Sequence, residues 1–237
     1  MLELSKVNTY YQNSHVLHDI SMKVDAGQIV ALLGRNGVGK TTTMRTIMGL
    51  TPSRRGTITF KGKDISRLKP FQIAREGIGF VPEERWIFPS LTVHQNLLIG
   101  LKPEKYAGKT GAAHWSTEKC YEAFPALKER QFSKGRTLSG GEQQMLTIAR
   151  TLVGNPELIL IDEPTEGLAP KNVEMVAKII RDINRLGITV LLVEQKLSIA
   201  LELADRIYII SKGMIQWEGT PEQLQGSEEI RKAYLEV

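Results

Sequence analysis

The sequence predicts an α/β protein with a mainly parallel sheet flanked by helices, an N-terminal antiparallel β subdomain and an inserted helical subdomain. Three observations support this prediction. A glycine-rich turn at residues 34–42 separates an apolar run from a helical pattern. A second apolar run, Leu158–Ile161, ends in two acidic residues. Helical and apolar segments then alternate towards the end of the chain, which is typical of βαβ winding.

The first segments of the chain predict a small antiparallel sheet. Leu2–Val7 and Ser21–Val24 alternate apolar and polar residues, as half-buried strands do. The polar stretch between them predicts a loop that contains Tyr10 and Tyr11. Further along the chain, Ile78–Val81 follows a glycine and predicts another strand.

Residues 82–155 differ from their surroundings, because tryptophans, prolines and polar helical stretches replace the β-rich pattern. Leu91–Gly100 and Thr117–Lys128 are amphipathic, and Lys102–Gly111 predicts a mobile loop because it is rich in glycine and lysine. We therefore expect one domain over 1–237. Its core would comprise 1–81 and 156–237, and 82–155 would be the helical insertion.

The core resumes after the insertion. The patterns predict a helix at Asn172–Leu186, a strand at Thr189–Val193, a helix at Lys196–Ala204, a strand at Ile207–Ile210 and one or two helices within Pro221–Val237. This alternation favours parallel pairing of the strands.

Composition excludes several classes of protein. The 237 residues are 41% hydrophobic and 24% charged, as in ordinary globular proteins, and the apolar runs are too short to span a bilayer. The single cysteine, Cys120, excludes an internal disulfide and a cysteine metal cluster. The net charge of +5 is spread along the chain, which argues against a nucleic-acid partner. The N-terminus lacks a signal-peptide pattern, so we expect a cytosolic protein that reaches membranes through a partner.

The turn at residues 34–42 has the spacing of a phosphate-binding P-loop, with Gly34, Gly39, Lys40 and Thr41 at the required positions. Glycines let the backbone N–H groups point inwards, and the start of the following helix adds a positive dipole end. Lys40 would reach the β- and γ-phosphates, and the Thr41 hydroxyl would ligate Mg²⁺. The turn therefore predicts nucleotide binding and a P-loop NTPase core.

The acidic pair after Leu158–Ile161 fits the second half of such a site. Asp162 would hold Mg²⁺, and Glu163 would polarise the water that attacks the γ-phosphate. The alternative is a pair of solvent-facing acids after a strand, which the P-loop disfavours.

A second anion site is predicted at Leu138–Gln144, where Ser139 would cap a helix and two glycines would expose backbone N–H groups. A single nucleotide does not need two cradles. The second one makes sense if it closes on a nucleotide held by another subunit.

These residues resemble the ATP-binding cassette (ABC) proteins, because LSGGEQQ is similar to the family's signature motif and lies in the family's order between P-loop and acidic pair. The resemblance covers essentially the whole chain and implies ATP and Mg²⁺ as cofactors. Tyr11 would stack on adenine, and Ser139, Gly140 and Gly141 would contact the γ-phosphate of ATP on the opposite subunit. The resemblance assigns nucleotide binding to Tyr11, Gly34, Arg35, Asn36, Gly37, Val38, Gly39, Lys40, Thr41, Thr42, Ser139, Gly140 and Gly141.

Three positions depart from the usual cassette pattern. Glu83 stands where most cassettes have the Q-loop glutamine, Ala169 replaces the D-loop aspartate, and Gln195 replaces the switch histidine. By resemblance, Glu83 would act in catalysis and at the metal together with Thr41 and Asp162, and Gln195 would act in catalysis beside Glu163.

VPEER, EPTEGLAP and LLVEQ resemble the paired ATPase subunits of branched-chain amino-acid importers, although urea and amide importers are similar. The implied partners are a second cassette, expected to be a paralogue, two membrane permease subunits and, indirectly, a solute-binding protein. The implied location is the cytoplasmic face of the plasma membrane. The alternatives are a soluble ABC ATPase acting on nucleic acid or the ribosome, and an exporter-type cassette.

Overall fold

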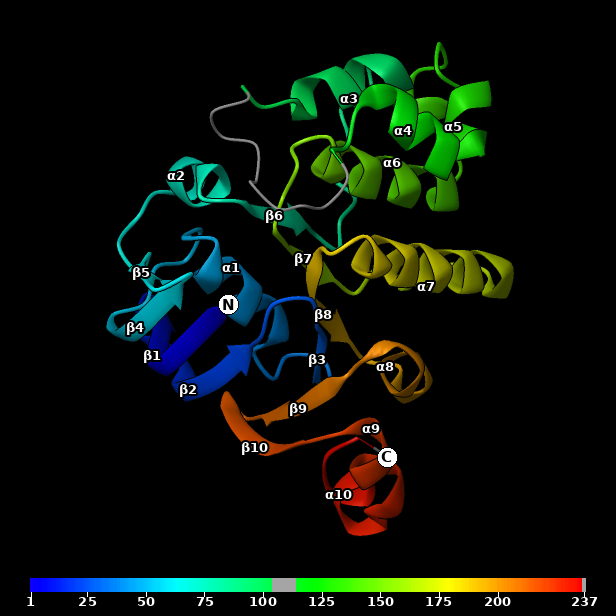
Figure 1. Ribbon diagram of the computed structural model, residues 1–237. Helices are drawn as coiled ribbons and strands as arrows, with labels where there is room; N and C mark the ends of the chain where they lie inside the picture. The colour runs from blue at the N-terminus through cyan, green and yellow to red at the C-terminus, as the bar shows by residue number, and fades with distance from the viewer. Residues whose placement is uncertain (104–113, 236–237) are drawn as a thin grey trace. The chain divides into compact units, whose positions relative to one another are not determined.

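The computed structural model describes residues 1–103 and 114–235, so most of the predicted loop Lys102–Gly111 lies outside the described residues. The chain forms two compact units (Figure 1). Unit 1 comprises Met1–Ala74 and Thr189–Val237, and unit 2 comprises Arg75–Ile188. The predicted division into 1–81 with 156–237 and an insertion over 82–155 stays a prediction.

Unit 1 contains a four-stranded sheet in the order β2-β1-β4-β5, and its strand pairs are antiparallel, as the sequence predicted. Its strands are β1 Leu2–Tyr11, β2 Ser14–Val24, β4 Arg55–Phe60 and β5 Lys63–Asp64. Burial alternates at the start of β1, where Leu2 and Leu4 are buried, and at the end of β2, where Ile20, Met22 and Val24 are buried, which is the pattern of a sheet with one face on the core.

The prediction that Tyr10 and Tyr11 lie in a loop was wrong. Both belong to β1, where Tyr10 pairs with His15 and Tyr11 with Ser14. The polar composition hid this part of the hairpin, which cross-strand contacts stabilise. The rings of Tyr10 and His15 stack with centroids 4.1 Å apart, and the Arg54 guanidinium lies 4.5 Å from the Tyr10 ring centroid.

The remaining strands of unit 1 lie in the order β10-β9-β3-β8, with β3 parallel to both β8 and β9. Every residue of β3 and β8 is buried, as expected for apolar runs covered on both faces. Helices α8, α9 and α10 supply Ala200, Leu224 and Tyr234 to a core that includes Leu33. The elements are β3 Ile29–Leu33, α1 Lys40–Ile47, α2 Pro70–Arg75, β8 Thr189–Glu194, α8 Leu197–Leu203, β9 Arg206–Ser211, β10 Met214–Gly219, α9 Pro221–Gly226 and α10 Glu228–Tyr234.

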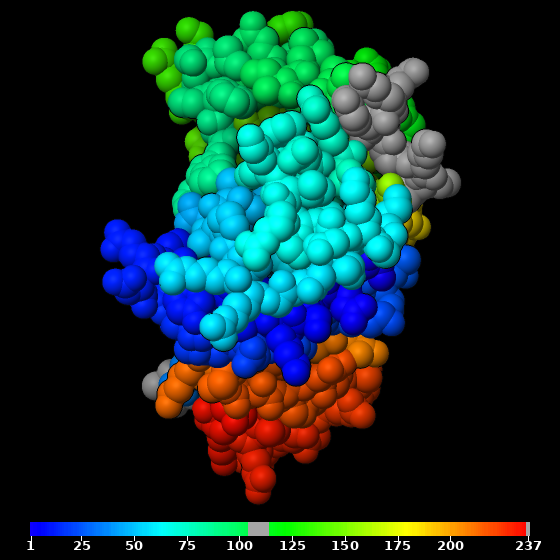
Figure 2. Space-filling model, turned by 90° about the vertical axis from the view of Figure 1, so that its left-hand side faces the viewer, coloured from blue at the N-terminus to red at the C-terminus, as the bar shows by residue number. Residues whose placement is uncertain are grey.

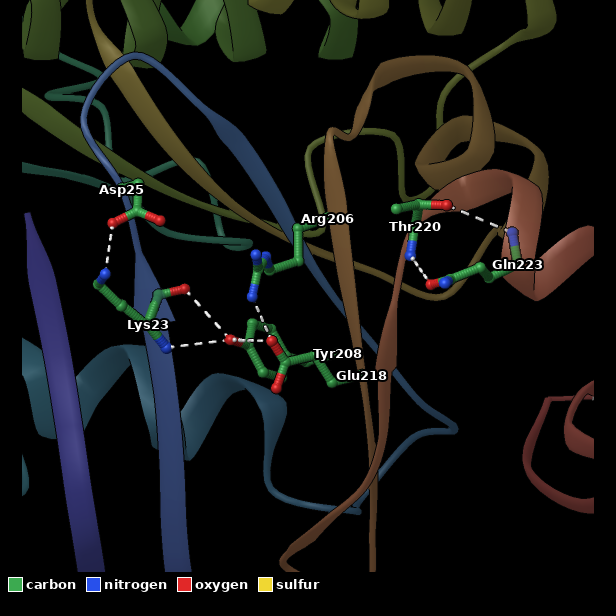
Figure 3. Close-up of polar contacts among 7 residues, drawn as sticks. All are labelled: Lys23, Asp25, Arg206, Tyr208, Glu218, Thr220 and Gln223. Atoms are coloured by element: carbon green, nitrogen blue, oxygen red, sulfur yellow. Dashed lines mark hydrogen bonds and ion pairs between the residues drawn. The ribbon is translucent and has the colours of Figure 1, made fainter.

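Tyr208 ties the two sheets of unit 1 together (Figure 3). This side chain of β9 is 2% exposed, and burial raises its pKa. Its hydroxyl lies 3.0 Å from Glu218 Oε1 on β10 and accepts the backbone N–H of Lys23 on β2 at 3.2 Å. The N-terminal strands and β9–β10 accordingly lie side by side, shown in blue and orange in Figure 2.

Unit 2 contains the parallel pair β6 and β7 and a group of helices. α6 packs against α3, α5 and β6 through buried residues such as Leu146 and Ile148. The amphipathic stretch Thr117–Lys128 forms two helices, because Pro125 interrupts the backbone hydrogen bonding. The elements are β6 Ile78–Val81, α3 Val93–Gly100, α4 Thr117–Ala123, α5 Pro125–Glu129, the 3₁₀ helix η2 Gly135–Thr137, α6 Gly140–Leu152, β7 Leu158–Asp162 and α7 Pro170–Arg185.

Candidate nucleotide-binding site

The P-loop connects β3 to α1 in unit 1. Gly39 caps α1 with a φ of 113°, a conformation that glycine adopts without strain. A Cβ atom built on Gly34 would lie 2.5 Å from the Ile210 carbonyl oxygen, so the backbone approaches β9 too closely for any side chain. Arg35, Asn36 and Gly37 are exposed at the tip of the loop. The local geometry is that of an anion cradle at a helix start.

Lys40 lies across this loop. Its ammonium group donates to the carbonyl oxygens of Gly34 and Arg35 at 2.8 and 2.9 Å, although the residue is only 4% exposed. Thr41 is half-buried beside it, at the first turn of α1. The cation and the hydroxyl therefore stand where the sequence predicted them, at the start of the helix.

Tyr11 leaves the end of β1 towards α1. Its hydroxyl accepts a hydrogen bond from Thr51 Oγ1 at 3.5 Å, and the residue is 42% exposed. Burial raises the pKa of Tyr11, but hydrogen bonds with Thr51 and Thr42 and the charge of Arg45 outweigh that effect and lower it. The tyrosine thus lies beside the P-loop helix with part of its ring open to solvent.

Gln195 follows β8, and its position is set by strand pairing. Leu33 pairs with Glu194, so Gly34 and Gln195 leave neighbouring parallel strands at the same edge of the sheet. The Glu194 carboxylate is 2% exposed and accepts the backbone N–H of Gln195 at 3.2 Å. The structure therefore brings the start of the P-loop and Gln195 together.

In unit 2, strand pairing likewise brings two segments that contain acidic residues to one edge of the sheet. Val81 pairs with Ile161, so the segments that begin with Pro82–Glu83 and Asp162–Glu163 leave neighbouring strands side by side. Asp162 and Glu163 are 1% and 8% exposed, and Glu163 has a φ of 43°. Buried carboxylates at the carboxyl end of parallel strands are suited to a metal and a reacting water.

The second predicted cradle lies at the start of α6. Ser139 forms a capping box with Glu142, because its hydroxyl accepts the Glu142 N–H and the Glu142 carboxylate accepts the Ser139 N–H. A Cβ atom on Gly141 would lie 2.7 Å from Asn172 Nδ2, and one on Gly140 would lie 3.0 Å from Arg85 Nη1. The Arg85 and Asn172 side chains therefore lie close to these two glycines, and both would have to shift to admit a larger residue.

The residues present fit a magnesium nucleotide. In residues 1–103 and 114–235, no cluster of three or more His, Cys, Asp or Glu side chains could hold a metal ion. A Mg²⁺ ion would therefore depend on phosphate oxygens in addition to protein oxygen ligands, which is how Mg²⁺ is commonly bound with nucleotides. The predicted roles of the individual site residues stay predictions.

Sequence reasoning missed three residues that support the site. Thr51 donates a hydrogen bond to the Tyr11 hydroxyl, and the Glu194 carboxylate accepts the backbone N–H of Gln195. Arg85 lies close to the start of α6. Glu194 was detectable as an acidic residue at the end of an apolar run. Arg85 and Thr51 act through contacts distant in sequence, which no local pattern indicates.

Comparison with known proteins identifies similar chains. The family model described as ABC transporter matches residues 17–166. The high-affinity branched-chain amino acid transport ATP-binding protein BraG of Pseudomonas aeruginosa is 41% identical over 99% of both chains. The lipopolysaccharide export system ATP-binding protein LptB of Haemophilus influenzae is 38% identical over 95% of this chain and 92% of its own. The probable branched-chain amino acid transport ATP-binding protein LivF of Archaeoglobus fulgidus is 34% identical over 100% of this chain and 99% of its own.

Solved structures show the same fold. A nucleotide-free ATP-binding cassette from an ABC transporter superposes with a TM-score of 0.81 at 28% identity, covering 95% of this chain and 94% of that one. A dimeric cassette in a post-hydrolysis state with ADP and Pi gives a TM-score of 0.78 at 27% identity, and the match covers 93% of this chain and 99% of that one. Through the described ranges, no helix is long and apolar enough to cross a membrane.

Proposed function

This chain belongs to the ABC transporter family and is an ABC ATPase, and from that premise we propose that it powers an importer of branched-chain amino acids or related small polar solutes. The similarity to BraG supports the proposal most strongly, because it extends over 99% of both chains. The motif details at Glu83, Ala169 and Gln195 also resemble such importers.

ATP binding follows from family membership, and we propose how this chain's residues perform it. Backbone N–H groups of residues 35–42 and the Lys40 ammonium bind the β- and γ-phosphates, and Tyr11 stacks on adenine. Thr41, Asp162 and Glu83 would hold Mg²⁺, which would neutralise phosphate charge.

Hydrolysis in this proposal depends on two further groups. The Glu163 carboxylate accepts a proton from the attacking water and orients it towards the γ-phosphate. Gln195 donates a neutral hydrogen bond to the same phosphate, which is weaker than the bond from a charged donor. Ser139, Gly140 and Gly141 bind the γ-phosphate of ATP on a partner cassette, so two cassettes close head to tail.

We propose that the partner cassette is a paralogue and that the pair works with two permease subunits and a solute-binding protein. The chain would then lie at the cytoplasmic face of the plasma membrane, attached through the permeases. Trp86 and Phe88 are 46% and 45% exposed, and side chains of this kind favour a partner that covers them. These two residues are the proposed permease contact.

Reconstitution tests this function. The chain would be co-purified with the permease subunits encoded beside it and placed in proteoliposomes with the cognate solute-binding protein. Uptake of labelled leucine, isoleucine or valine that requires ATP supports the proposal. The similarity to LptB favours lipopolysaccharide export as the second candidate. ATPase stimulation by lipopolysaccharide together with no uptake of amino acids, urea or amides would support that alternative and overturn the first.

A further inference from the structure

Arg85 occupies a position in unit 2 that the predicted site does not explain. It belongs to the segment after β6 and has a φ of 49°, which side chains rarely adopt. Its guanidinium Nη2 donates to the carbonyl oxygen of Glu166 at 2.8 Å. Glu166 closes the turn that begins at Glu163, because its N–H donates to the Glu163 carbonyl at 3.1 Å. Arg85 therefore holds the turn that carries the proposed general base.

The same guanidinium lies against the signature residues. A Cβ atom built on Gly140 would be 3.0 Å from Arg85 Nη1, and one on Gly167 would be 3.8 Å from Nη2. One planar group is thus hydrogen-bonded to the turn after Glu163 and lies close to the start of α6. Arginine suits this position because its donors are arranged in a rigid fork, whereas a lysine ammonium is a single point on a flexible stem.

The segment that follows Arg85 is held by a second arginine. Arg150 of α6 donates to the Trp86 carbonyl oxygen, and its guanidinium lies 5.1 Å from the Phe88 ring centroid. The Phe88 N–H donates to Asn96 Oδ1 of α3 at 2.8 Å. Trp86 and Phe88 are therefore fixed in backbone position while their side chains stay half-exposed, directly beside Arg85.

We propose that Arg85 is a positioning residue that holds the Glu163 turn and the signature residues in register with the segment Trp86–Phe88. The inference rests on the proposed function, because it assumes that Glu163 and Gly140 belong to ATP sites. It assigns to Arg85 the task of ordering the Glu163 turn for hydrolysis.

The test uses the full chain with Arg85→Ala and Arg85→Lys, and Arg185→Ala as a matched loss of an exposed arginine of unit 2. Steady-state ATPase assays with MgATP give kcat and KM. Arg85→Ala should lower kcat about tenfold and leave KM for MgATP within about twofold, because the P-loop is unchanged. Arg85→Lys should restore less than half of the loss, since it keeps the charge without the fork. Arg185→Ala should match the wild type.

Hydrogen–deuterium exchange of the nucleotide-free chain supplies a readout besides activity. Arg85→Ala should speed exchange of the amides at 139–142 and 163–168 and leave those at 39–43 unchanged. Wild-type kcat, or unchanged exchange at both segments, would overturn the role of Arg85. General loss of protection in Arg85→Ala would indicate a folding defect. Arg85→Lys then decides the question, because wild-type behaviour of that variant in both assays would count against a positioning role for Arg85.

A failure of the proposed function can be distinguished from a failure of the role of Arg85. If the wild-type chain bound no MgATP, the ATP-site assignment would be wrong, whereas the exchange experiment would still report whether Arg85 holds the two segments. Conversely, normal ATP hydrolysis by Arg85→Ala would contradict only the role of Arg85.

Discussion

Glu194 lies opposite Leu33 on neighbouring parallel strands, and this pairing places Gln195 at the same sheet edge as Gly34. The Glu194 carboxylate also accepts the backbone N–H groups of Gln195 and Lys196, at 3.2 and 3.4 Å. The position of the candidate switch residue is thus built into the strand register of unit 1.

This placement predicts the effect of a charged donor. Gln195→His should raise the ATPase kcat of the chain severalfold, because a protonated histidine makes a charge-assisted bond to phosphate that is roughly twice as strong as a neutral one. The rise should be greatest below about pH 6.5, where histidine is protonated. Gln216→His, at an exposed position, is the control. Equal rates in all three proteins at every pH would contradict the role of Gln195.

Lys40→Ala should weaken ATP binding by at least about tenfold, because it removes a charge-assisted donor worth roughly 1.5–3 kcal/mol. Isothermal titration with MgATP measures the effect. Lys232→Ala removes a lysine that pairs with Glu228 on the surface and should bind ATP as the wild type does. An unchanged Kd in Lys40→Ala would refute the P-loop assignment.

Glu163→Gln should keep ATP binding and lower the hydrolysis rate about 10²–10⁴-fold, because the amide cannot accept the proton of the attacking water. Gel filtration of the variant together with its partner cassette and MgATP should then show the closed dimer accumulating. The substitution is nearly isosteric, which limits its effect on the Glu163 turn. Hydrolysis at the normal rate would remove Glu163 from the catalytic role.

Trp86 and Phe88 should contact a permease. Cysteine or photo-crosslinking side chains at these positions should form crosslinks to a permease cytoplasmic loop in the assembled complex. Phe132 is 80% exposed and belongs to the same unit, so the same probes there serve as the control. Crosslinks from position 132 in place of 86 and 88 would move the contact to a different surface of unit 2.

Cys120 should resist alkylation. It is 0% exposed, its thiol donates to the Ala149 carbonyl at 3.6 Å, and burial raises its pKa to about 12. The reactive thiolate is therefore scarce in the folded chain at pH 8. Iodoacetamide should modify the native protein far more slowly than protein unfolded in guanidinium, and an added cysteine in Trp86→Cys should react quickly. Fast modification of native Cys120 would contradict its burial.

The same shift has a consequence for stability. The folded thiol keeps its proton to higher pH than the unfolded one, whose pKa is about 8.5. The unfolded chain therefore loses this proton first, and the contribution of Cys120 to stability falls as pH rises above about 8.5.

Local signals predicted much of the fold. The P-loop, the strand before it and the helix after it were predicted because glycine spacing and apolar runs are signals contained within a few neighbouring residues. Ile78–Val81 was predicted with its observed bounds. The hairpin of β1 and β2 was underestimated, since the pairs at Tyr10–His15 and Tyr11–Ser14 are stabilised across strands and not along them.

The sequence by itself determined which chemical groups the protein carries and in what order: a phosphate cradle, an acidic pair and a signature motif. These depend on residue type and short spacing, which the linear chain contains. Only the tertiary structure decided that Leu33 pairs with Glu194, that Tyr11 reaches Thr51, and that the Arg85 guanidinium binds Glu166 and lies close to Gly140. Those relationships join residues up to 161 positions apart, as for Leu33 and Glu194, and arise from strand register and packing, which no local pattern encodes.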